Sequence, residues 1–397
     1  MKKHLKNICI LRHGYYPSDV RVYKEARALA EAGYAVDLIC LREGGQSLRE
    51  VLDGVHVYRM PHSHRRGSTL RYVFEYGLSV LLMSLCLSLL FFRRRYRVVQ
   101  VNTLPDSLVF SAWLPRLCGA RILLDMHEPS PELLMTKHGG MVSERVLRLH
   151  ILLEKLAIRF AHRVMTVNDT IRLRFIERGA SPEKLFVVRN VPPDEFGLHA
   201  VAESHEGLVI MTHGTLQPRY GQSVILHALP LIRKELDSVR LIVAGSGEIL
   251  DELRDLAINL NCEDITEFTG QVSREEIAAL IANADIGIVP LLPGPFAELC
   301  QPNKLFEYIA LKTAVIASRL PAIEESFDDT SLLFFQAGDA AGLANAVIRL
   351  GKDPDLRIAL SEQAFMRYQK LCWRKAKLDY VRIVDTLSGK KDHAEPA

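Results

Sequence analysis

Short apolar runs alternate along the chain with longer stretches in which apolar and polar residues repeat at helical spacing. NICILR is followed by VRVYKEARALAEAG, and AVDLICL, VHVYRM, VVQVN and RILLDM continue the alternation. Runs of this length predict strands, and the stretches between them predict helices. Strands interleaved with helices predict a parallel sheet with covered faces, so we expect an α/β fold of the doubly wound, Rossmann-like kind.

The same alternation begins again after a polar, Pro-containing segment at residues 190–206. The runs GLVIMTHG, VRLIVAG, ITEFTG, IGIVPL and TAVIAS then follow, separated by predicted helices. A chain of 397 residues is long enough for two domains. We predict one domain over residues 1–190 and a second over residues 191–372, facing a central cleft. A last helix and tail, residues 373–397, are expected to pack back towards the first domain.

Composition and charge narrow the class of protein. The chain is 48% hydrophobic and 24% charged, which is typical of a globular protein. Its net charge is only +3 and its basic residues cluster locally, so nucleic-acid binding is not favoured. The seven cysteines are scattered and never spaced as C-x-x-C, which argues against a disulfide framework or a zinc site and fits a reducing cytoplasm.

In doubly wound sheets ligands bind beyond the carboxyl ends of the strands, so the residues that follow strands are the first candidates. In the second domain VRLIVAG runs into Gly245 and Gly247, whose backbone N–H groups are suited to a phosphate, although many such turns are only tight turns. Arg219 follows the preceding strand. It either neutralises a diphosphate or is a solvated loop arginine.

The strongest local feature of the second domain is PNKLFEYIA, which predicts a helix whose positive end points to the cleft. Lys304 adds charge beside that end, and Glu307, about one turn further on, is placed to accept both hydroxyls of a ribose. The alternative is a Pro-started helix with a surface Lys and Glu.

Candidates in the first domain follow two of its strands. RILLDM runs into His127, which is well placed to touch a bound sugar, although a lone His at a strand end is more often a hydrogen-bonded structural residue. The first strand is predicted to end in a loop that holds Gly14 at the cleft. Asp19 follows in the same loop and can also be read as a helix cap.

Together these segments resemble the retaining family 4 glycosyltransferases of GT-B fold, over nearly the whole chain. The order and spacing of the segments make the joint match specific. They are YYPSDVRVYKEARALAEAGYAV, VNTLPDSLVFSAWLPRLCGARILLDMHEPSPE, FVVRNVP, HGTLQPRYG, LIVAGSGE, FTGQVSREEIAALIANADIGIVPL and QPNKLFEYIA. The chain looks most similar to bacterial members that build surface polysaccharides and O-antigen units.

The resemblance implies a nucleotide-sugar donor on the second domain and the transferred sugar beside His127. With the residues above it defines two groups of candidates. The catalytic candidates are His127, Asp19 and Glu307. The donor-binding candidates are Gly14 in the loop at the cleft, Arg219, Gly245 and Gly247 near the diphosphate, Gln271 and Val272 near the base, and Lys304, Leu305 and Glu307 on the predicted helix.

One departure from the family concerns its paired glutamates. Many members carry two glutamates eight positions apart. Here the second is Glu307, the first position holds Leu299, and Glu298 is one place out of register. No glutamate nucleophile is therefore assigned.

A second departure concerns the diphosphate. The family places an Arg and a Lys after the first strand of the second domain, where this chain has Thr215 and Tyr220. Arg219 or Lys304 is expected to supply the positive charge instead.

The expected reaction transfers a hexose-type sugar from a UDP- or GDP-sugar to a saccharide carried on a polyprenyl diphosphate, with retention of anomeric configuration. No metal is expected, because the DPD sequence at residues 353–355 reads as a turn and helix cap. The alternatives are a GT-B-fold sugar-nucleotide epimerase and a catalytically silent scaffold subunit. The expected location is cytoplasmic, peripheral at the inner face of the cytoplasmic membrane.

An uncharged apolar run, YGLSVLLMSLCLSLLFF at residues 76–92, is followed at once by Arg93, Arg94, Arg95 and Arg97. We expect a helix over residues 73–97 that faces an anionic membrane surface. An entirely buried core helix is the alternative. A spanning helix would carry the chain across the bilayer between two strands of one sheet. Of the three possibilities it is the one that fits the predicted sheet least well.

Overall fold

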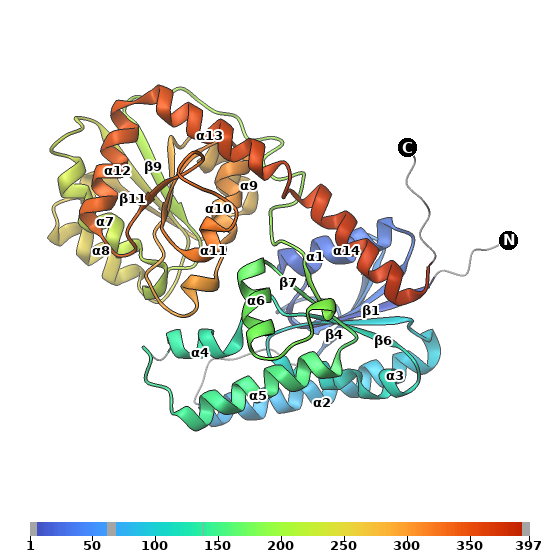
Figure 1. Ribbon diagram of the computed structural model, residues 1–397. Coiled ribbons are helices and arrows are strands. Elements are labelled where there is room, and N and C mark those ends of the chain that lie inside the picture. Colours follow the sequence, from blue (N-terminus) through green and yellow to red (C-terminus); the bar gives the residue numbers. More distant parts are fainter. Residues whose placement is uncertain (1–5, 62–68, 138, 391–397) are drawn as a thin grey trace. The chain divides into compact units, whose positions relative to one another are not determined.

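The computed structural model describes residues 6–61, 69–137 and 139–390 (Figure 1). It divides into two compact units, residues 1–189 with 375–397 (unit 1) and residues 190–374 (unit 2). The predicted boundaries, 190/191 and 372/373, lie beside these divisions. Both units are α/β with parallel sheets, so the predicted fold class is confirmed.

Unit 1 is built on an eight-stranded sheet of order β3-β4-β2-β1-β5-β6-β7-β8. All neighbouring strands are parallel except β3 and β4, which form an antiparallel hairpin at the edge. The strands are β1 (Asn7–Tyr15), β2 (Ala35–Leu41), β3 (Arg49–Leu52), β4 (Val55–Met60), β5 (Val98–Asn102), β6 (Arg121–Asp125), β7 (Arg163–Thr166) and β8 (Leu185–Val187).

The helices of unit 1 lie on both faces of this sheet (Figure 1). The C-terminal helix returns to unit 1 and packs beside α1, where the Tyr34 hydroxyl lies 3.1 Å from Ser388 Oγ. The helices are α1 (Val20–Glu31), α2 (Thr69–Arg94), α3 (Trp113–Leu117), α4 (Ser130–Lys137), α5 (Glu144–Phe160), α6 (Asp169–Glu177) and α14 (Trp373–Ser388), with 3-10 turns η1 (Asp106–Ala112) and η2 (Pro182–Lys184).

Unit 2 has a six-stranded, all-parallel sheet of order β11-β10-β9-β12-β13-β14. Strands β9, β12 and β13 are buried along their whole length, as expected for short continuous apolar runs covered by helices, whereas the edge strands β11 and β14 are only partly buried. The strands are β9 (Leu208–His213), β10 (Val239–Ala244), β11 (Thr266–Gly270), β12 (Ile286–Val289), β13 (Ala314–Ser318) and β14 (Leu333–Phe335).

The helices of unit 2 pack around this sheet and close one hydrophobic core, in which Ile210, Leu229 and Val347 are fully buried. They are α7 (Gln222–Ile232), α8 (Leu250–Asn259), α9 (Arg274–Ala282), α10 (Asn303–Ala310), α11 (Pro321–Glu324), α12 (Ala340–Lys352) and α13 (Pro354–Tyr368), with 3-10 turns η3 (Pro218–Tyr220), η4 (Glu263–Ile265) and η5 (Ala297–Leu299). Asp353 of the DPD sequence caps α13 by accepting a hydrogen bond from the Leu356 N–H.

Three local features differ from the predictions. Strand β1 continues to Tyr15, so Gly14 lies in the strand and not in a loop. The hairpin of β3 and β4 turns at Asp53 and Gly54, which both have positive φ, the requirement of a tight Asp-Gly hairpin turn. The apolar helix spans Thr69–Arg94 and ends at Arg95 with φ +54, so the predicted range 73–97 runs past its end.

The strand orders place two switch points, where connections leave neighbouring strands in opposite directions. They lie between β1 and β5 in unit 1 and between β9 and β12 in unit 2. Ligands of doubly wound sheets bind outside the carboxyl ends of the strands at such points.

Candidate functional site

His127 follows β6 in unit 1, one strand from the switch point. Its Nδ1 lies 3.1 Å from Asp125 Oδ2, and its side chain is 13% exposed while Asp125 is fully buried. The ring is therefore fixed from one side and open on the other. With Asp125 ionised, Nδ1 is the donor to the carboxylate, and Nε2 is the nitrogen left to face a ligand.

Asp125 is ionised because three groups hold its charge. Arg21 of α1 donates to both carboxylate oxygens, at 2.8 Å each, and Asn102 donates to Oδ2 at 2.7 Å. Burial alone would raise the pKa of this carboxyl, but the charges of Arg21 and His127 outweigh burial and hold the pKa below its usual range. The strand-end pattern predicts His127 as a site residue but does not predict this support.

The support extends through a buried polar network. Glu25 accepts from Gln100 at 2.8 Å and from Asn102 at 3.0 Å, and burial, opposed by Arg21, raises its pKa to about 7. The Tyr380 hydroxyl of α14 donates to Gln100 Oε1 at 2.7 Å. A hydrogen-bonded chain thus runs from the C-terminal helix to the ring of His127.

Asp19 serves as the N-cap of α1, since its Oδ1 accepts from the Val22 N–H at 3.2 Å. Its other oxygen, Oδ2, pairs with Arg12 Nε at 2.8 Å. A side chain at Gly14 would meet the same arginine, because an added Cβ would lie 3.0 Å from Arg12 Nε. The structure thus joins Gly14 and Asp19 through Arg12, and the cap reading of Asp19 is confirmed.

In unit 2, two glycine turns cross at the carboxyl ends of β9 and β10. Gly214 and Gly245 have φ of +110° and +137°. A Cβ at Gly245 would lie 2.0 Å from the Gly214 carbonyl oxygen, and one at Gly247 would lie 2.0 Å from that of Leu216. Close backbone packing by itself requires glycine at Gly245 and Gly247. Because glycine has no side chain, the space above the strand ends is also left open at these positions.

Gln271 and Val272 follow β11, next to these turns. The Gly270 carbonyl accepts from the Gly245 N–H at 2.8 Å, which brings the end of β11 against the glycine turn. Gln271 is exposed and Val272 is half-buried. The structure therefore places both predicted base-contacting residues beside Gly245.

Helix α10 begins over the switch point, and the packing of Tyr308 places it there. Gly287 of β12 makes room, because a Cβ at that position would lie 2.4 Å from the Tyr308 ring. The Tyr308 ring packs edge-on to His213, and its hydroxyl donates to the Met211 carbonyl at 3.3 Å. These contacts fix the rotation of α10 and hence the direction of Lys304 and Glu307.

Lys304 is 7% exposed, and its Nζ would lie 3.9 Å from a Cβ at Gly214. Among the described residues no hydrogen bond or salt bridge holds its ammonium. Burial, opposed by the charge of Glu307, lowers its pKa to about 8. A buried, unpaired cation above a glycine turn has the character of an anion site.

Glu307 lies one turn further along α10 and is 20% exposed. Its Oε2 lies 3.3 Å from Nε2 of His213 at the end of β9. Burial and the charge of Lys304 lower the pKa of His213 to about 3, so this imidazole is neutral. The sequence analysis misses His213, although it stands at the predicted strand end.

Arg219 stacks on Tyr220, with its guanidinium carbon 4.7 Å from the ring centroid. Lys304 approaches the same ring at 5.8 Å. Tyr220 occupies one of the family's basic positions, and the two cations predicted to replace that charge converge on it. Arg219 Nε, Gln217 Oε1 and Gln222 Oε1 are buried and have no hydrogen-bond partner among the described residues.

One candidate, Leu305, is not available as a side chain, and neither is Leu299 at the family's first glutamate position. Leu305 is fully buried, and its N–H is bonded to the Pro302 carbonyl at 3.1 Å. Leu299 is 2% exposed, whereas Glu298 beside it is exposed. Leu305 is therefore part of the core under α10.

Unit 2 thus brings Arg219, Gly245, Lys304 and Glu307 to one end of its sheet, and unit 1 holds His127 at the corresponding end of its own. Among the described residues, no three His, Cys, Asp or Glu side chains lie close enough together to hold a metal ion.

Comparison with known families matches both halves of the chain. Residues 18–191 match the family "Glycosyl transferase 4-like domain", and residues 207–353 match "Glycosyl transferases group 1".

Curated relatives and solved structures agree with these matches. The phosphatidyl-myo-inositol mannosyltransferase of Mycolicibacterium smegmatis is 31% identical over 46% of this chain, and an amylovoran biosynthesis glycosyltransferase of Erwinia amylovora is 25% identical over 45%. The match spans 46% and 45% of the length of these two relatives. The sucrose-phosphate synthase of Thermosynechococcus elongatus shares the fold, with a TM-score of 0.77 and 17% identity over 97% of this chain and 99% of its own. The chain belongs to the family 4 glycosyltransferases of GT-B fold.

Proposed function

We propose that this chain is a retaining hexosyltransferase that moves a sugar from a UDP- or GDP-sugar to a saccharide carried on a polyprenyl diphosphate, without a metal ion. The observation that carries the proposal is the cationic site of unit 2. Lys304 is buried beside two crossed glycine turns with no hydrogen bond or salt bridge to any residue that the structure describes, and it shares the Tyr220 ring with Arg219.

The chemistry of this site follows from charge. Departure of a nucleoside diphosphate builds negative charge on the phosphates, and fixed cations and N–H groups aimed at that charge lower the barrier. Lys304, Arg219 and the start of α10 supply positive charge, and the unpaired buried atoms of Gln217, Arg219 and Gln222 supply polar groups for a ligand. Glu307 lies one turn away, 20% exposed, and accepts hydrogen bonds from the ribose hydroxyls.

In unit 1, His127 contacts the transferred sugar through Nε2, with Asp125 holding the other nitrogen. Asp19 acts indirectly, because both of its oxygens are engaged and it orients Arg12. Retention by front-face attack fits a site in which Glu307 has no second carboxylate in the family's register.

The relatives support the nature of the acceptor. One is a mannosyltransferase acting on phosphatidyl-myo-inositol, a lipid, and another serves amylovoran biosynthesis. A lipid-linked saccharide acceptor places the enzyme at the inner face of the cytoplasmic membrane, in the synthesis of a surface polysaccharide.

The test is a melting-temperature and donor-hydrolysis screen with UDP-sugars and GDP-mannose in the presence of EDTA, because a ligand that binds the folded form raises its melting temperature. We expect one nucleotide class to stabilise the protein, and we expect Glu307→Ala to lose that shift. Product analysis of the transferred sugar gives its anomeric configuration. No shift and no hydrolysis with any donor would favour a silent subunit, and release of an isomerised free sugar would favour an epimerase.

A further inference from the structure

Helix α2 exposes an apolar stripe. Its other face packs on the sheet side of unit 1, where Met83 and Leu87 are fully buried. The exposed residues recur at helical spacing along the outer face and are Leu81 (56% exposed), Leu85 (55%), Leu89 (70%) and Phe92 (56%). The helix is therefore neither an entirely buried core helix nor one with an ordinary polar outer face.

Helix α5 exposes a second apolar stripe, which the sequence analysis does not anticipate. Leu149 is 53% exposed and Leu152 is 51% exposed, with Val146 and Leu156 at 43% on the same face. In the short helix α3, Trp113 and Leu117 are also exposed.

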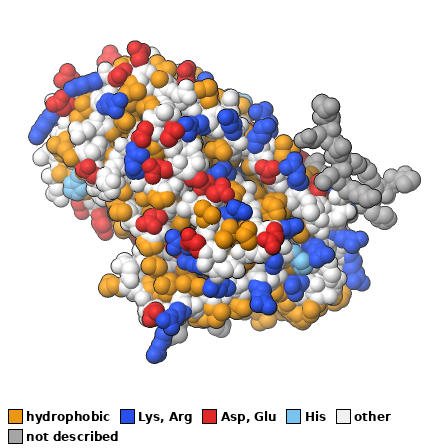
Figure 2. All heavy atoms as spheres, viewed as in Figure 1, with side chains coloured by type: hydrophobic (Ala, Val, Ile, Leu, Met, Phe, Trp, Pro, Cys, Tyr) orange, Lys and Arg blue, Asp and Glu red, His pale blue; other side chains and the backbone are white. Residues whose placement is uncertain are grey.

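The two stripes lie on one side of unit 1. Both helices pack on η1. Ser84 Oγ of α2 donates to the Ser111 carbonyl at 3.4 Å, and the Phe110 ring packs against Phe160 of α5 with centroids 5.4 Å apart. Figure 1 shows α2 and α5 running along the same edge, and Figure 2 shows hydrophobic side chains interspersed with Lys and Arg there. Contiguous exposed apolar surface of this kind marks an interaction site.

The charge of this side is strongly positive. Residues 76–97, 113–121 and 144–163 contain eleven Lys and Arg and two Glu, whereas the whole chain has a net charge of only +3. One of the two glutamates, Glu154, is buried against Arg178. Arg148, Lys155 and Arg159 form an exposed cationic stripe beside the leucines of α5.

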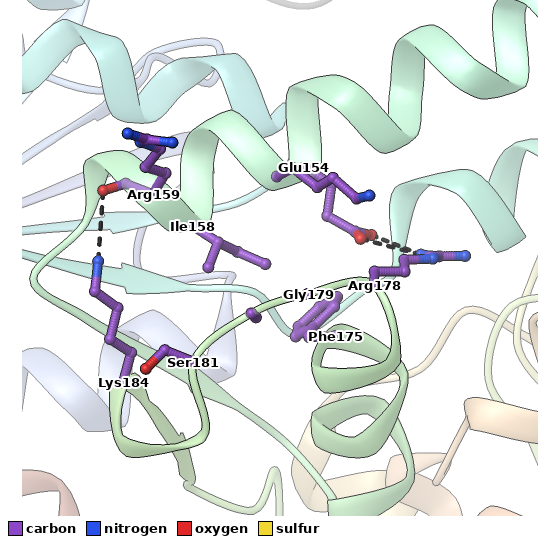
Figure 3. Close-up of a pocket in the computed structure, with 10 residues that line it drawn as sticks. Glu154, Ile158, Arg159, Phe175, Arg178, Gly179, Ser181 and Lys184 are labelled. Carbon is purple, nitrogen blue, oxygen red and sulfur yellow. Dashed lines mark hydrogen bonds and ion pairs between the residues drawn. The ribbon is translucent and has the colours of Figure 1, made fainter.

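The lowered pKa values of Lys184 and His162 agree with the positive charge of this side. Burial together with Arg116, Arg159 and Arg163 lowers the pKa of Lys184. Burial together with Arg121 and Arg116 lowers the pKa of His162 to about 4. Figure 3 shows Lys184 and Arg159 at a cavity of about 380 Å³ beneath the end of α5, where Lys184 Nζ donates to the backbone carbonyls of Arg159 and Ala161.

We propose that α2, α3 and α5 form one docking face by which unit 1 lies on an anionic lipid bilayer. The leucines and Phe92 enter the acyl-chain boundary, and the surrounding arginines and lysines bind headgroup phosphates. The inference deepens the proposed function, since a lipid-linked acceptor is presented at such a surface.

Charge and topology decide between the possible occupants of this face. A second copy of the chain would set two strongly positive faces against each other, which opposes self-association. The segment Tyr76–Arg94 has a mean hydropathy of 1.8 and is long and apolar enough to cross a membrane. However, α2 joins β4 to β5 within one sheet and packs on it, so it lies along the bilayer surface.

The experiment is co-sedimentation of the full chain with phosphatidylcholine vesicles, with and without phosphatidylglycerol. We expect binding to the anionic vesicles that weakens with salt. Replacing two leucines of α5, as Leu149→Glu with Leu152→Glu, should weaken binding by roughly a hundredfold, since each buried leucine contributes about a factor of ten. The pair Leu85→Glu with Leu89→Glu on α2 should act alike, and Arg148→Gln with Arg159→Gln should weaken only the anionic component.

Ile258→Glu is the matched control, because Ile258 is 57% exposed on α8 of unit 2 and should leave binding unchanged. Unchanged binding of the folded α5 variant, with its fold checked by circular dichroism, would overturn the three-helix face. Concentration-dependent dimerisation that the α5 variant abolishes would assign the face to a second copy instead. Donor hydrolysis in solution should persist in all these variants, so loss of docking is separable from failure of the proposed activity.

Discussion

His127 follows strand β6 in unit 1, and His213 ends strand β9 in unit 2. Both lie beside a carboxylate, but their surroundings give them opposite properties. His127 lies beside an ionised Asp125 and keeps 13% of its side chain exposed, so its ring is able to meet a ligand. His213 is buried next to Lys304, and its pKa is lowered to about 3. The comparison teaches that burial, together with a neighbouring charge, decides whether a histidine is a chemical group or a packing group.

The largest expected effect comes from removing the carboxylate that supports His127. Asp125→Asn leaves the buried Arg21 guanidinium without its bidentate partner. Breaking a buried ion pair costs about 3–5 kcal/mol, and we expect about 3 because Glu25 remains 3.1 Å from Arg21. Urea unfolding at pH 7 measures this loss. Asp379→Asn, at an exposed ion pair of α14, is the control and should cost under about 1 kcal/mol.

Lys304, whose charge adds to burial in lowering the pKa of His213, should dominate donor turnover. Lys304→Met should lower kcat by roughly 10²–10³, the usual cost of removing one preorganised group that stabilises developing charge. Stability should not fall, because a buried unpaired cation is lost. A variant with normal turnover would remove Lys304 from the mechanism.

The lowered pKa of Lys304 gives a pH dependence with a definite sign. The pKa is about 8 in the folded protein and higher in the unfolded chain, so the unfolded state binds more protons between these values. Stability should therefore rise as pH increases above about 8, while affinity for a nucleoside diphosphate should fall as the ammonium is lost. Calorimetric titration with UDP or GDP at several pH values measures the fall, and Lys304→Arg, which stays charged, should abolish it.

Tyr380→Phe tests the distant end of the network that supports His127. It removes one hydroxyl, bonded to Gln100, and should cost about 1 kcal/mol of unfolding free energy. Donor binding to unit 2 should be unchanged. Urea unfolding measures the loss of stability in this variant, and calorimetry measures its donor binding.

The smallest effect is expected at His213. His213→Gln keeps a neutral hydrogen-bonding side chain beside Glu307, so donor affinity should change by no more than about threefold, less than 1 kcal/mol. The pH profile of turnover above pH 5 should not move. A displaced acidic limb would show that His213 titrates and would end the contrast with His127.

The alternation of apolar runs and helical stretches predicts the central strands of both sheets, because strands buried on two faces need continuous apolar sequence. It does not predict the short strands β3, β7, β8 and β14. Lys304 and Glu307 are also placed correctly, since a helix start after a strand has a fixed position in this fold. Arg21 and Asp125 are more than 100 residues apart, and their pairing depends on sheet register and helix rotation. The exposed leucines of α5 illustrate a second limit, because an amphipathic pattern identifies an apolar face without telling what covers it.

The return of α14 to unit 1 has a consequence for how the chain is made. Gln100 and Glu25 lie in sequence synthesised early, but the hydroxyl that completes their network belongs to Tyr380, near the end. Unit 2, residues 190–374, is continuous in sequence and has all its strands as soon as those residues leave the ribosome. Domains usually fold in the order in which they are synthesised. Here the later half of the polypeptide is complete first, and the earlier half waits for the last helix to be released.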